Sequence, residues 1–291
     1  MDKVAPMADN AGGRGAVVIT GASTGIGRAC ALDLDSRGFR VFAGVRRDED
    51  AERLRSDRPS IEPLRIDVTD ADSIAAARDR VTEAVGGAGL AGLVNNAGIA
   101  VPGPLEHLPI DEFRRQMEVN LVGQVAVTQA FLPLVRTARG RIVNIGSIGG
   151  RVALPLLGPY AASKHAMEGI SDSLRRELRP WGIEVSLVRP GPIATEIWDR
   201  GNANADELLE RMPDAAADYG AAIAAARSFA AQRTREAVPP SAVAKVVAHA
   251  LTADRPRTRY LVGPRARLLA TLRAVLPDRW FDTVLDRASR R

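Results

Sequence analysis

The feature that most constrains the fold is an alternation of short apolar runs with helix-like segments over the first 190 residues. The apolar runs lack strict apolar–polar alternation, which is typical of strands buried on both faces of a parallel sheet. They fall at 16–20, 40–45, 61–66, 92–95, 141–145 and 183–188. Helical patterns fall at 25–37, 70–85, 111–136 and 160–179, with Asp111 as an expected cap. The sequence therefore predicts a doubly wound α/β domain, with its ligand crevice at the carboxyl ends of the strands.

A glycine-rich turn follows the first apolar run. Gly21, Gly25 and Gly27 lie between that run and the helix-like segment after it. Glycines let the backbone approach a ligand closely, and the N–H groups at a helix N-terminus favour an anion. The turn therefore predicts pyrophosphate binding. Its spacing, Gly-x3-Gly-x-Gly, differs from the common Gly-x-Gly-x2-Gly, and a simple tight turn is the alternative.

Tyr160 and Lys164 form the most distinctive chemical pair. Residues four apart on a helix share a face, so the phenol and the ammonium project side by side. With three Tyr and three Lys in the chain, chance would place them at this spacing only about 0.03 times. A phenol titrates near pH 10, and a neighbouring cation lowers its pKa. The pair predicts a proton donor and acceptor; a solvated helix face is the alternative.

Composition and charge restrict the class of protein. The apolar content of 46% suffices for a sizeable core, and the single cysteine, Cys30, fits a reducing compartment. Residues 1–14 lack a signal-peptide pattern and are expected to be a disordered lead. The apolar run 121–135 falls short of a membrane span. We expect a soluble, cytoplasmic protein with no metal site.

The net charge of +5 is unevenly distributed along the chain. Residues 255–291 contain ten arginines and three aspartates, a charge of +7, which leaves about −2 for residues 1–254. The body of the chain therefore lacks the basic footprint that binding to nucleic acid requires, and we expect no nucleic-acid partner.

Taken in order, the motifs resemble those of the short-chain dehydrogenases/reductases. The matching segments are Thr20-Gly-Ala-Ser-Thr-Gly-Ile-Gly27, Asp67-Val68, Asn95-Asn-Ala-Gly98, Asn120, Ser147, Tyr160-x3-Lys164 and Pro190-Gly191-x3-Thr195. The resemblance covers about residues 15–262. It implies a single Rossmann-type domain with about seven strands, which transfers a hydride between a nicotinamide cofactor and an alcohol or carbonyl.

The resemblance implies four catalytic residues. Ser147 would hold the substrate oxygen and Tyr160 would exchange the proton. Lys164 would bind the nicotinamide ribose and lower the pKa of Tyr160. Asn120, a poor helix former inside a long predicted helix, would hold a water that links Lys164 to solvent. A turn hydroxyl at Ser147 and a solvated or core amide at Asn120 are the alternatives.

The same resemblance implies the residues that bind the cofactor. The turn contributes Gly21, Ser23, Thr24, Gly25, Ile26 and Gly27, and the adenosine side is lined by Asp67, Val68, Asn95, Ala97 and Gly98. Tyr160 and Lys164 would face the ribose. The nicotinamide carboxamide would lie against Pro190, Gly191, Ile193 and Thr195.

The choice of cofactor depends on the end of the second strand. Arg46 and Arg47 follow it, and the first acidic residue is Asp48. An arginine there accommodates the 2′-phosphate of NADP, whereas an acidic residue would hold the ribose hydroxyl of NAD. We therefore expect NADP(H) rather than NAD(H), although Thr24 stands where many NADP-dependent members have Lys or Arg. Two solvated arginines at a helix start are the alternative.

The substrate can be predicted only as a class. Residues 100–102, 152–157 and 197–198, expected near the pocket, are apolar. Between 204 and 235, helical spacing relates Leu208, Met212, Tyr219, Ile223 and Ala230. This pattern predicts a lid within 195–238 over an apolar secondary alcohol or ketone of steroid- or retinoid-like type, although core packing would explain it too. A 3-oxoacyl reductase with a basic entrance and a non-catalytic nucleotide-binding sensor are the alternative functions.

Residues 263–291 form a basic, amphipathic extension. One helical face contains Leu268, Leu269, Leu272, Val275 and Leu276; after Pro277, a second contains Trp280, Phe281, Val284 and Leu285. Arginines surround both, at positions 265, 267, 273, 279 and 287. We expect these faces to pack on the chain itself or on a subunit of a homodimer or homotetramer. Contact of residues 265–287 with a membrane surface is the alternative.

Overall fold

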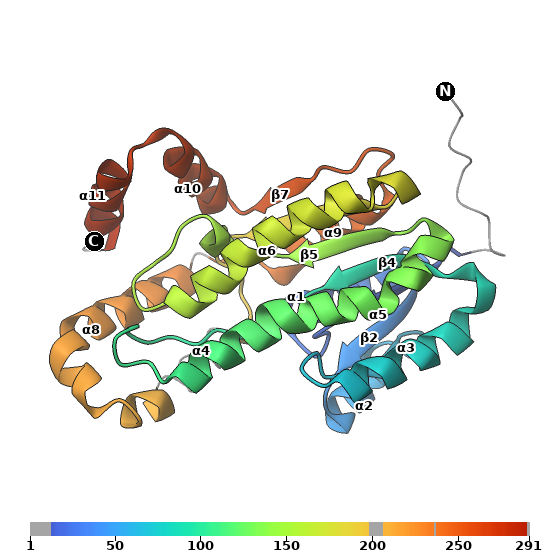
Figure 1. Cartoon of the computed structure of the whole chain (residues 1–291), viewed down its shortest axis with the longest axis horizontal. Helices are drawn as coiled ribbons and strands as arrows, with labels where there is room; N and C mark the ends of the chain where they lie inside the picture. Colours follow the sequence, from blue (N-terminus) through green and yellow to red (C-terminus); the bar gives the residue numbers. More distant parts are fainter. Residues whose placement is uncertain (1–12, 198–205, 236, 290–291) are drawn as a thin grey trace.

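The computed structural model describes residues 13–197, 206–235 and 237–289 (Figure 1). Most of the predicted disordered lead, 1–14, and part of the predicted lid lie outside these residues. The described chain contains a seven-stranded parallel sheet in the order β3-β2-β1-β4-β5-β6-β7. The strands are β1 (Ala16–Ile19), β2 (Arg40–Val45), β3 (Glu62–Arg65), β4 (Leu90–Asn95), β5 (Arg141–Ile145), β6 (Glu184–Pro190) and β7 (Arg259–Val262). The doubly wound prediction is confirmed.

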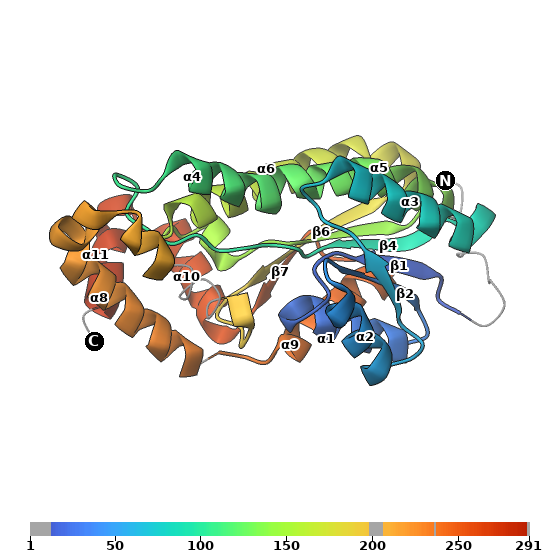
Figure 2. The ribbon, with the colours of Figure 1, turned by 90° about the horizontal axis from the view of Figure 1, so that it is seen from below.

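Helices cover both faces of the sheet (Figure 2). One face is covered by α1 (Gly25–Ser36), α2 (Asp48–Asp57) and α9 (Pro240–Thr252), and the other by α3 (Ala71–Val85), α5 (Gly123–Ala138) and α6 (Gly158–Glu177). The remaining long helices are α4 (Ile110–Met117), α8 (Pro213–Arg235), α10 (Pro264–Val275) and α11 (Asp278–Ser289). Of these four helices, α8, α10 and α11 lie beyond the carboxyl ends of the strands (Figure 1), and α4 leads into α5.

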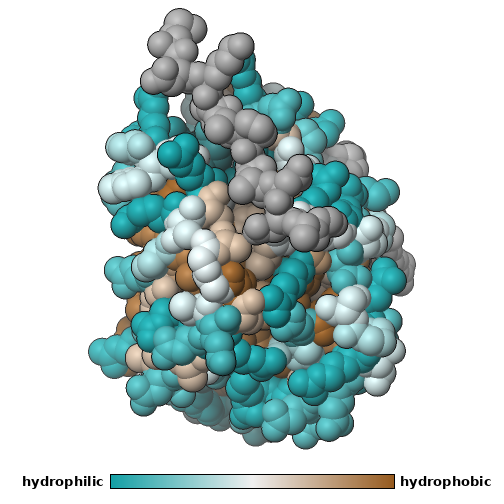
Figure 3. Space-filling view, turned by 90° about the vertical axis from the view of Figure 1, so that its right-hand side faces the viewer, coloured by the Kyte–Doolittle hydropathy of each residue, from teal (hydrophilic) through white to brown (hydrophobic). Residues whose placement is uncertain are grey.

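The core is divided by the sheet into two apolar clusters. Successive strand residues point to opposite faces, so Val17 and Ile19 join the cluster beneath α1 and α9. Val18 joins the cluster with Phe42 and Phe131, both fully buried. Burying a side chain of this size contributes about 1.5–3 kcal/mol to stability. Viewed from the amino ends of the strands, hydrophobic residues fill the centre within a hydrophilic rim (Figure 3).

The long helix predicted for 111–136 is interrupted. After α4 the backbone continues as a π-helical turn, Glu118–Val122, before α5 begins. The expected cap at Asp111 is wrong, because Pro109 occupies that position and Asp111 instead accepts a hydrogen bond from Arg211, at 2.8 Å. The interval 110–138 is long and apolar enough to cross a membrane by length and composition alone. Its buried residues, however, pack on the sheet in the same cluster as Phe131.

Candidate active site

The glycine turn lies between β1 and α1 and has a backbone that only glycine allows. Gly21 and Gly25 have φ angles of +64° and +54°, which larger residues rarely adopt. A Cβ at Gly27 would lie 2.2 Å from the Gly21 carbonyl oxygen, so only glycine fits. Thr24 precedes α1 without making a side-chain cap. The first-turn N–H groups are therefore not satisfied by that side chain, as an anion site requires.

The segment after β4 is fixed to this turn by hydrogen bonds. The Thr20 hydroxyl accepts from the N–H groups of Asn96 and Ala97, at 2.9 and 3.0 Å. The Asn96 side chain donates to the carbonyl oxygens of Thr20 and Gly21, both at 2.9 Å. Asn96 belongs to the Asn-Asn-Ala-Gly motif, the segment predicted to line the adenosine side, and here its side chain fixes this segment to the glycine turn.

Asn95 has a different orientation from the one expected. Its side chain is 3% exposed and donates to the Thr128 hydroxyl at 2.8 Å and to Asn144 Oδ1 at 2.9 Å. It therefore joins β4, α5 and β5 inside the protein, and its amide does not line the adenosine side. Ala97 and Gly98 occupy the loop itself, where Ala97 O also accepts from Gln124.

The loop after β6 returns to the glycine turn. A Cβ placed on Gly25 would lie 3.1 Å from Thr195 Cγ2, so the two segments are in close contact. Ile193 forms a parallel bridge with Val238, and the Gly191 N–H donates to Val262 O at 2.9 Å. The fold thus brings the turn predicted to bind the pyrophosphate against the loop predicted to face the nicotinamide.

Ser147 and Tyr160 meet at the carboxyl end of β5. Their hydroxyls are hydrogen-bonded, and both side chains are buried, with exposures of 9% and 8%. The Ser147 hydroxyl also accepts from the Gly149 N–H at 3.0 Å. A Cβ on Gly149 would lie 3.1 Å from Tyr160 Cε1 and 3.3 Å from Ser147 Oγ. Gly149, which sequence reasoning missed, therefore allows this close approach.

The structure corrects the expectation for the Tyr160 phenol. Burial raises its pKa above the ordinary value, and the hydrogen bond with Ser147 opposes this only in part. A lowering of this pKa by Lys164 was expected, but burial, the largest effect, raises it. A neutral phenol near pH 7 is the form that can donate a proton.

Lys164 lies beneath the phenol. Its Nζ is 5.8 Å from the centroid of the Tyr160 ring and donates to the Ile145 carbonyl oxygen at 2.9 Å. Burial lowers the pKa of this amine from 10.5 to about 8. The i, i+4 spacing thus places the two groups together, as predicted, in a site that disfavours charge on either of them.

Asn120 lies in the π-helical turn and is 1% exposed. Its side chain accepts from the Ile99 N–H at 2.8 Å and donates to Ile99 O at 3.0 Å and to the Ser163 hydroxyl at 3.2 Å. These bonds join the loop after β4 to the residue preceding Lys164. Asn120 therefore contacts α6, the helix that carries Tyr160 and Lys164. No local sequence pattern predicted the π-helical turn that orients Asn120, apart from the poor helix propensity of asparagine.

Arg46 follows β2 and Asp67 follows β3, the neighbouring strand of the sheet. Burial alone would raise the pKa of Asp67, but hydrogen bonds from the Thr69 N–H and hydroxyl, together with the Arg46 charge, lower it. Arg46 is exposed. Arg47 is also exposed, and its Nε lies 3.4 Å from a carboxylate oxygen of Asp50. Both arginines therefore lie at the end of β2, where the contact with a 2′-phosphate is predicted.

These residues fit an extended dinucleotide. The glycine turn would bind the pyrophosphate. Arg46 and Asp67 would face the adenosine end, and Lys164 and the loop 190–195 would face the nicotinamide end. The fit rests on positions where a Cβ would collide, at Gly21 and Gly27, and on the close contact of Gly25 with Thr195. Within the described ranges no group of three His, Cys, Asp or Glu residues is placed to hold a metal ion.

Residues 206–219 pack against the loop that connects β4 to α4. Leu208 and Met212 are buried in a small apolar cluster with Val101. Polar contacts surround the cluster: Arg211 pairs with Asp111 and Glu112, the Tyr219 hydroxyl donates to Glu106 at 2.7 Å, and His107 Nε2 lies 2.9 Å from Asp218. Of the remaining predicted lid residues, Ile223 and Ala230 are half-buried, and Trp198 lies outside the described residues.

The chain belongs to the short-chain dehydrogenase family, whose model matches residues 15–206. It is therefore an oxidoreductase of the NAD(P)-dependent kind. This agrees with the fold and with the Ser147, Tyr160 and Lys164 arrangement.

Several relatives match along most of their length. The chain is 37% identical to an NADPH-dependent 3-dehydrocapnine reductase of Ornithobacterium rhinotracheale, over 92% of this chain and 94% of the relative. It is 40% identical to human retinol dehydrogenase 16, covering 92% and 87%, and to human 17-beta-hydroxysteroid dehydrogenase type 6, covering 94% and 88%.

Solved structures show the same fold with either cofactor. A short-chain dehydrogenase from Burkholderia cenocepacia in complex with NADP superposes with a TM-score of 0.71 at 29% identity, over 92% of this chain and 94% of that one. One from Burkholderia phymatum in complex with NAD gives 0.75 at 26% identity, over 90% and 92%.

Proposed function

We propose that this protein uses NADP(H) to interconvert an apolar secondary alcohol and its ketone, of steroid- or retinoid-like type. The observation that carries the proposal is the buried group of Ser147, Tyr160 and Lys164 at the carboxyl end of β5. Its hydroxyls are hydrogen-bonded to each other, and the amine lies under the phenol ring. A nucleotide-binding sensor would have no need for such a group.

Ser147, Tyr160 and Lys164 would each have a separate role in the proton transfer. The nicotinamide, when bound, supplies the hydride for reduction or accepts it in oxidation. Ser147 would hold the substrate oxygen, and Tyr160 would donate its proton to that oxygen during reduction. Lys164, 5.8 Å from the ring centroid, would stabilise the phenolate that remains, because a nearby cation favours the charged form. Asn120 would fix the loop and α6 around this group.

The preference for an apolar substrate rests on the side chains near the site. Val101, Val152 and Met212 are buried beside the loops that follow β4 and β5. Arg211, which could have made the entrance basic, is neutralised by Asp111 and Glu112. A basic entrance for an acyl carrier is therefore not formed by this arginine. Relatives named for retinol and for a 17-beta-hydroxysteroid agree with a lipid-like substrate.

The reaction is tested by turnover on a panel of apolar ketones and alcohols with both cofactors. Tyr160→Phe retains the ring but lacks the transferable proton, so kcat should fall by at least about 100-fold. Cofactor affinity, followed by fluorescence titration, should be unchanged, which separates a chemical defect from a folding defect. A Phe variant that keeps most of its activity on a verified substrate would contradict the assigned role.

The cofactor preference is tested at Arg46. Pairing of a guanidinium with a phosphate dianion contributes roughly 1.5–3 kcal/mol per hydrogen bond. Arg46→Asp removes this attraction and supplies an acceptor for the ribose hydroxyl of NAD. The NADP-over-NAD ratio of kcat/KM should drop between about tenfold and a few hundredfold. Arg55→Asp, at an exposed position on α2, is the matched control and should leave the ratio unchanged.

The Arg46 experiment is measured at one fixed ionic strength, because salt screens part of the effect. Arg47 could compensate for Arg46, so the double variant at both positions is also measured. A wild-type preference for NAD, or an unchanged ratio in the double variant, would show that the two arginines are only surface charges.

A further inference from the structure

The C-terminal helices α10 and α11 are only partly packed on the rest of the chain. Their inner sides are buried: Ala266 is 0% exposed and Phe281 is 4% exposed. Their outer sides are not, since Trp280 and Val275 are 70% and 68% exposed. Within the chain itself, the predicted packing of these apolar faces is therefore only partial, because each helix presents part of its apolar face outward.

The outward residues form a defined surface, which we call the basic apolar face. It consists of Leu268, Val275, Trp280 and Val284 together with the exposed arginines Arg267, Arg279 and Arg287. Half of the large hydrophobic side chains that are exposed among the described residues belong to these two helices. Exposed large apolar side chains that gather on two successive helices indicate an interaction site.

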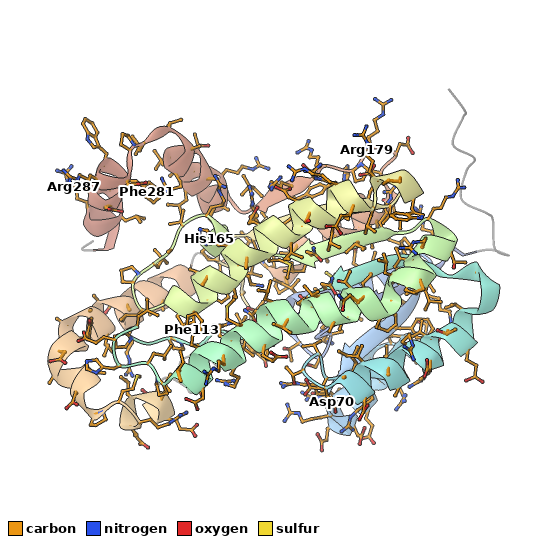
Figure 4. The ribbon with its side chains drawn as sticks, viewed as in Figure 1. Asp70, Phe113, His165, Arg179, Phe281 and Arg287 are labelled. Carbon is orange, nitrogen blue, oxygen red and sulfur yellow. The ribbon has the colours of Figure 1, made fainter. Side chains whose placement is uncertain are left out.

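Charge on α11 is separated between its two sides. Trp280, Val284 and Arg287 recur at i, i+4 and i+7 and share one side of the helix. Asp278 and Asp282 lie four apart on the opposite side, and Arg273 of α10 pairs with Asp278 at 2.8 Å. Figure 4 shows Phe281 directed inward and Arg287 directed away from the molecule. Trp280 and Val284 are therefore accompanied by Arg287, while Asp278 and Asp282 lie on the other side of the helix.

We propose that the basic apolar face binds an anionic lipid membrane surface. Helices that lie at a membrane interface combine apolar side chains with arginines and often a tryptophan at the headgroup level. A second copy of the chain fits less well. A two-fold dimer would place the same face against itself, and this face contains arginines but no acidic residue, so two copies would bring like charges together. α10 contains no acidic residue that could pair with them.

The position of this face relates it to the candidate active site. The strands all point toward the end of the molecule where α8, α10 and α11 lie (Figure 1). Two further exposed hydrophobic residues, Leu105 and Ile110, lie on the loop into α4 and at its start, at that same end. A membrane contacted there would lie beside the entrance to the site and not on the opposite side of the sheet.

The experiment is co-sedimentation of the full chain with vesicles of phosphatidylglycerol and phosphatidylcholine. Binding should be strong at low salt, weaken as salt is raised, and be lost with phosphatidylcholine alone. A second readout uses Trp181→Phe with Trp198→Phe, which leaves Trp280 as the only tryptophan. Its emission should shift to shorter wavelength when anionic vesicles are added.

Substitutions at the face separate its charge from its apolar side chains. Arg279→Glu with Arg287→Glu should lower the vesicle partition coefficient at least about 25-fold, since each arginine near an anionic surface is worth about fivefold. Trp280→Ser with Val275→Ser should lower it at least about tenfold. The matched control is Trp181→Ser with Val122→Ser, because these residues are 45% and 48% exposed elsewhere on the molecule. It should bind like the wild type.

Circular dichroism verifies that each variant is folded, and size-exclusion chromatography with light scattering follows its oligomeric state. A wild-type chain that ignores anionic vesicles at low salt would overturn the proposal. So would equal loss of binding in the control pair. If the Trp280 and Val275 substitutions instead dissociate an oligomer while vesicle binding persists, the face is a contact between copies of the chain, and the membrane proposal is wrong.

Discussion

Lys164→Met should stabilise the folded protein while abolishing turnover. The buried amine has its pKa lowered from 10.5 to about 8, which means that the folded state disfavours the charged form. This corresponds to about 3 kcal/mol of lost stability near pH 7. Methionine has a similar length and carries no charge. It also removes the hydrogen bond to Ile145 O, worth about 1 kcal/mol, so the net gain should be about 2 kcal/mol.

The stability difference between Lys164→Met and the wild type should depend on pH. Below pH 8 the amine is charged in both the folded and unfolded states, and the full cost applies. Between pH 8 and 10.5 it is neutral in the folded state but still charged in the unfolded state, so the cost shrinks as pH rises. The cost should be about 3 kcal/mol at pH 7, about 2 at pH 9 and about 1 at pH 10. After the hydrogen-bond loss, the advantage of Lys164→Met should be close to zero at pH 10.

The assay is urea unfolding of both proteins at pH 7, 8, 9 and 10, with the free energy of unfolding taken by linear extrapolation. Lys245→Met is the matched control, because Lys245 is exposed on α9 and should change stability little at any pH. A Lys164→Met variant that is less stable than the wild type at pH 7 would refute the reasoning. A stability difference that does not vary with pH would refute it equally.

Two further predictions concern buried positions. Gly27→Ala should destroy cofactor binding and lower the free energy of unfolding by several kcal/mol, because the new Cβ would lie 2.2 Å from the Gly21 carbonyl oxygen. Fluorescence titration measures the affinity for the cofactor, and urea unfolding measures the stability. An alanine variant with native affinity would show that the turn adapts. Burial, with a smaller contribution from Asp33, raises the pKa of the Cys30 thiol to about 12. The native protein should therefore resist thiol reagents up to pH 9 and react only on unfolding; rapid labelling of the native form would contradict this.

The parts of the fold that could be predicted are those with a strong local pattern. Buried parallel strands such as β1 are apolar throughout, and the glycines after it are required by backbone geometry. The Tyr160 and Lys164 pair follows from the period of a helix. β7, by contrast, was not located from its pattern, because it has only four residues and two of them, Arg259 and Leu261, are half-buried.

Other features depend on contacts between distant segments. The direction of the Asn95 side chain is set by Thr128 and Asn144, which no nearby residue indicates. The phenol pKa depends on how deeply Tyr160 is buried, and the spacing to Lys164 carries no information about that. In the same way, periodicity identified the apolar positions of α10 and α11 but could not tell which of them another element would cover.

The contact between α10 and the loop after β6 couples two binding events. Ala266 is fully buried, and a Cβ on Gly191 would lie 3.3 Å from its methyl group. The first turn of the helix that carries the basic apolar face therefore rests on the segment facing the nicotinamide. If lipid binding shifts this helix, the affinity for the cofactor changes by some factor. Thermodynamic linkage then requires the cofactor to change the affinity for the lipid surface by the same factor.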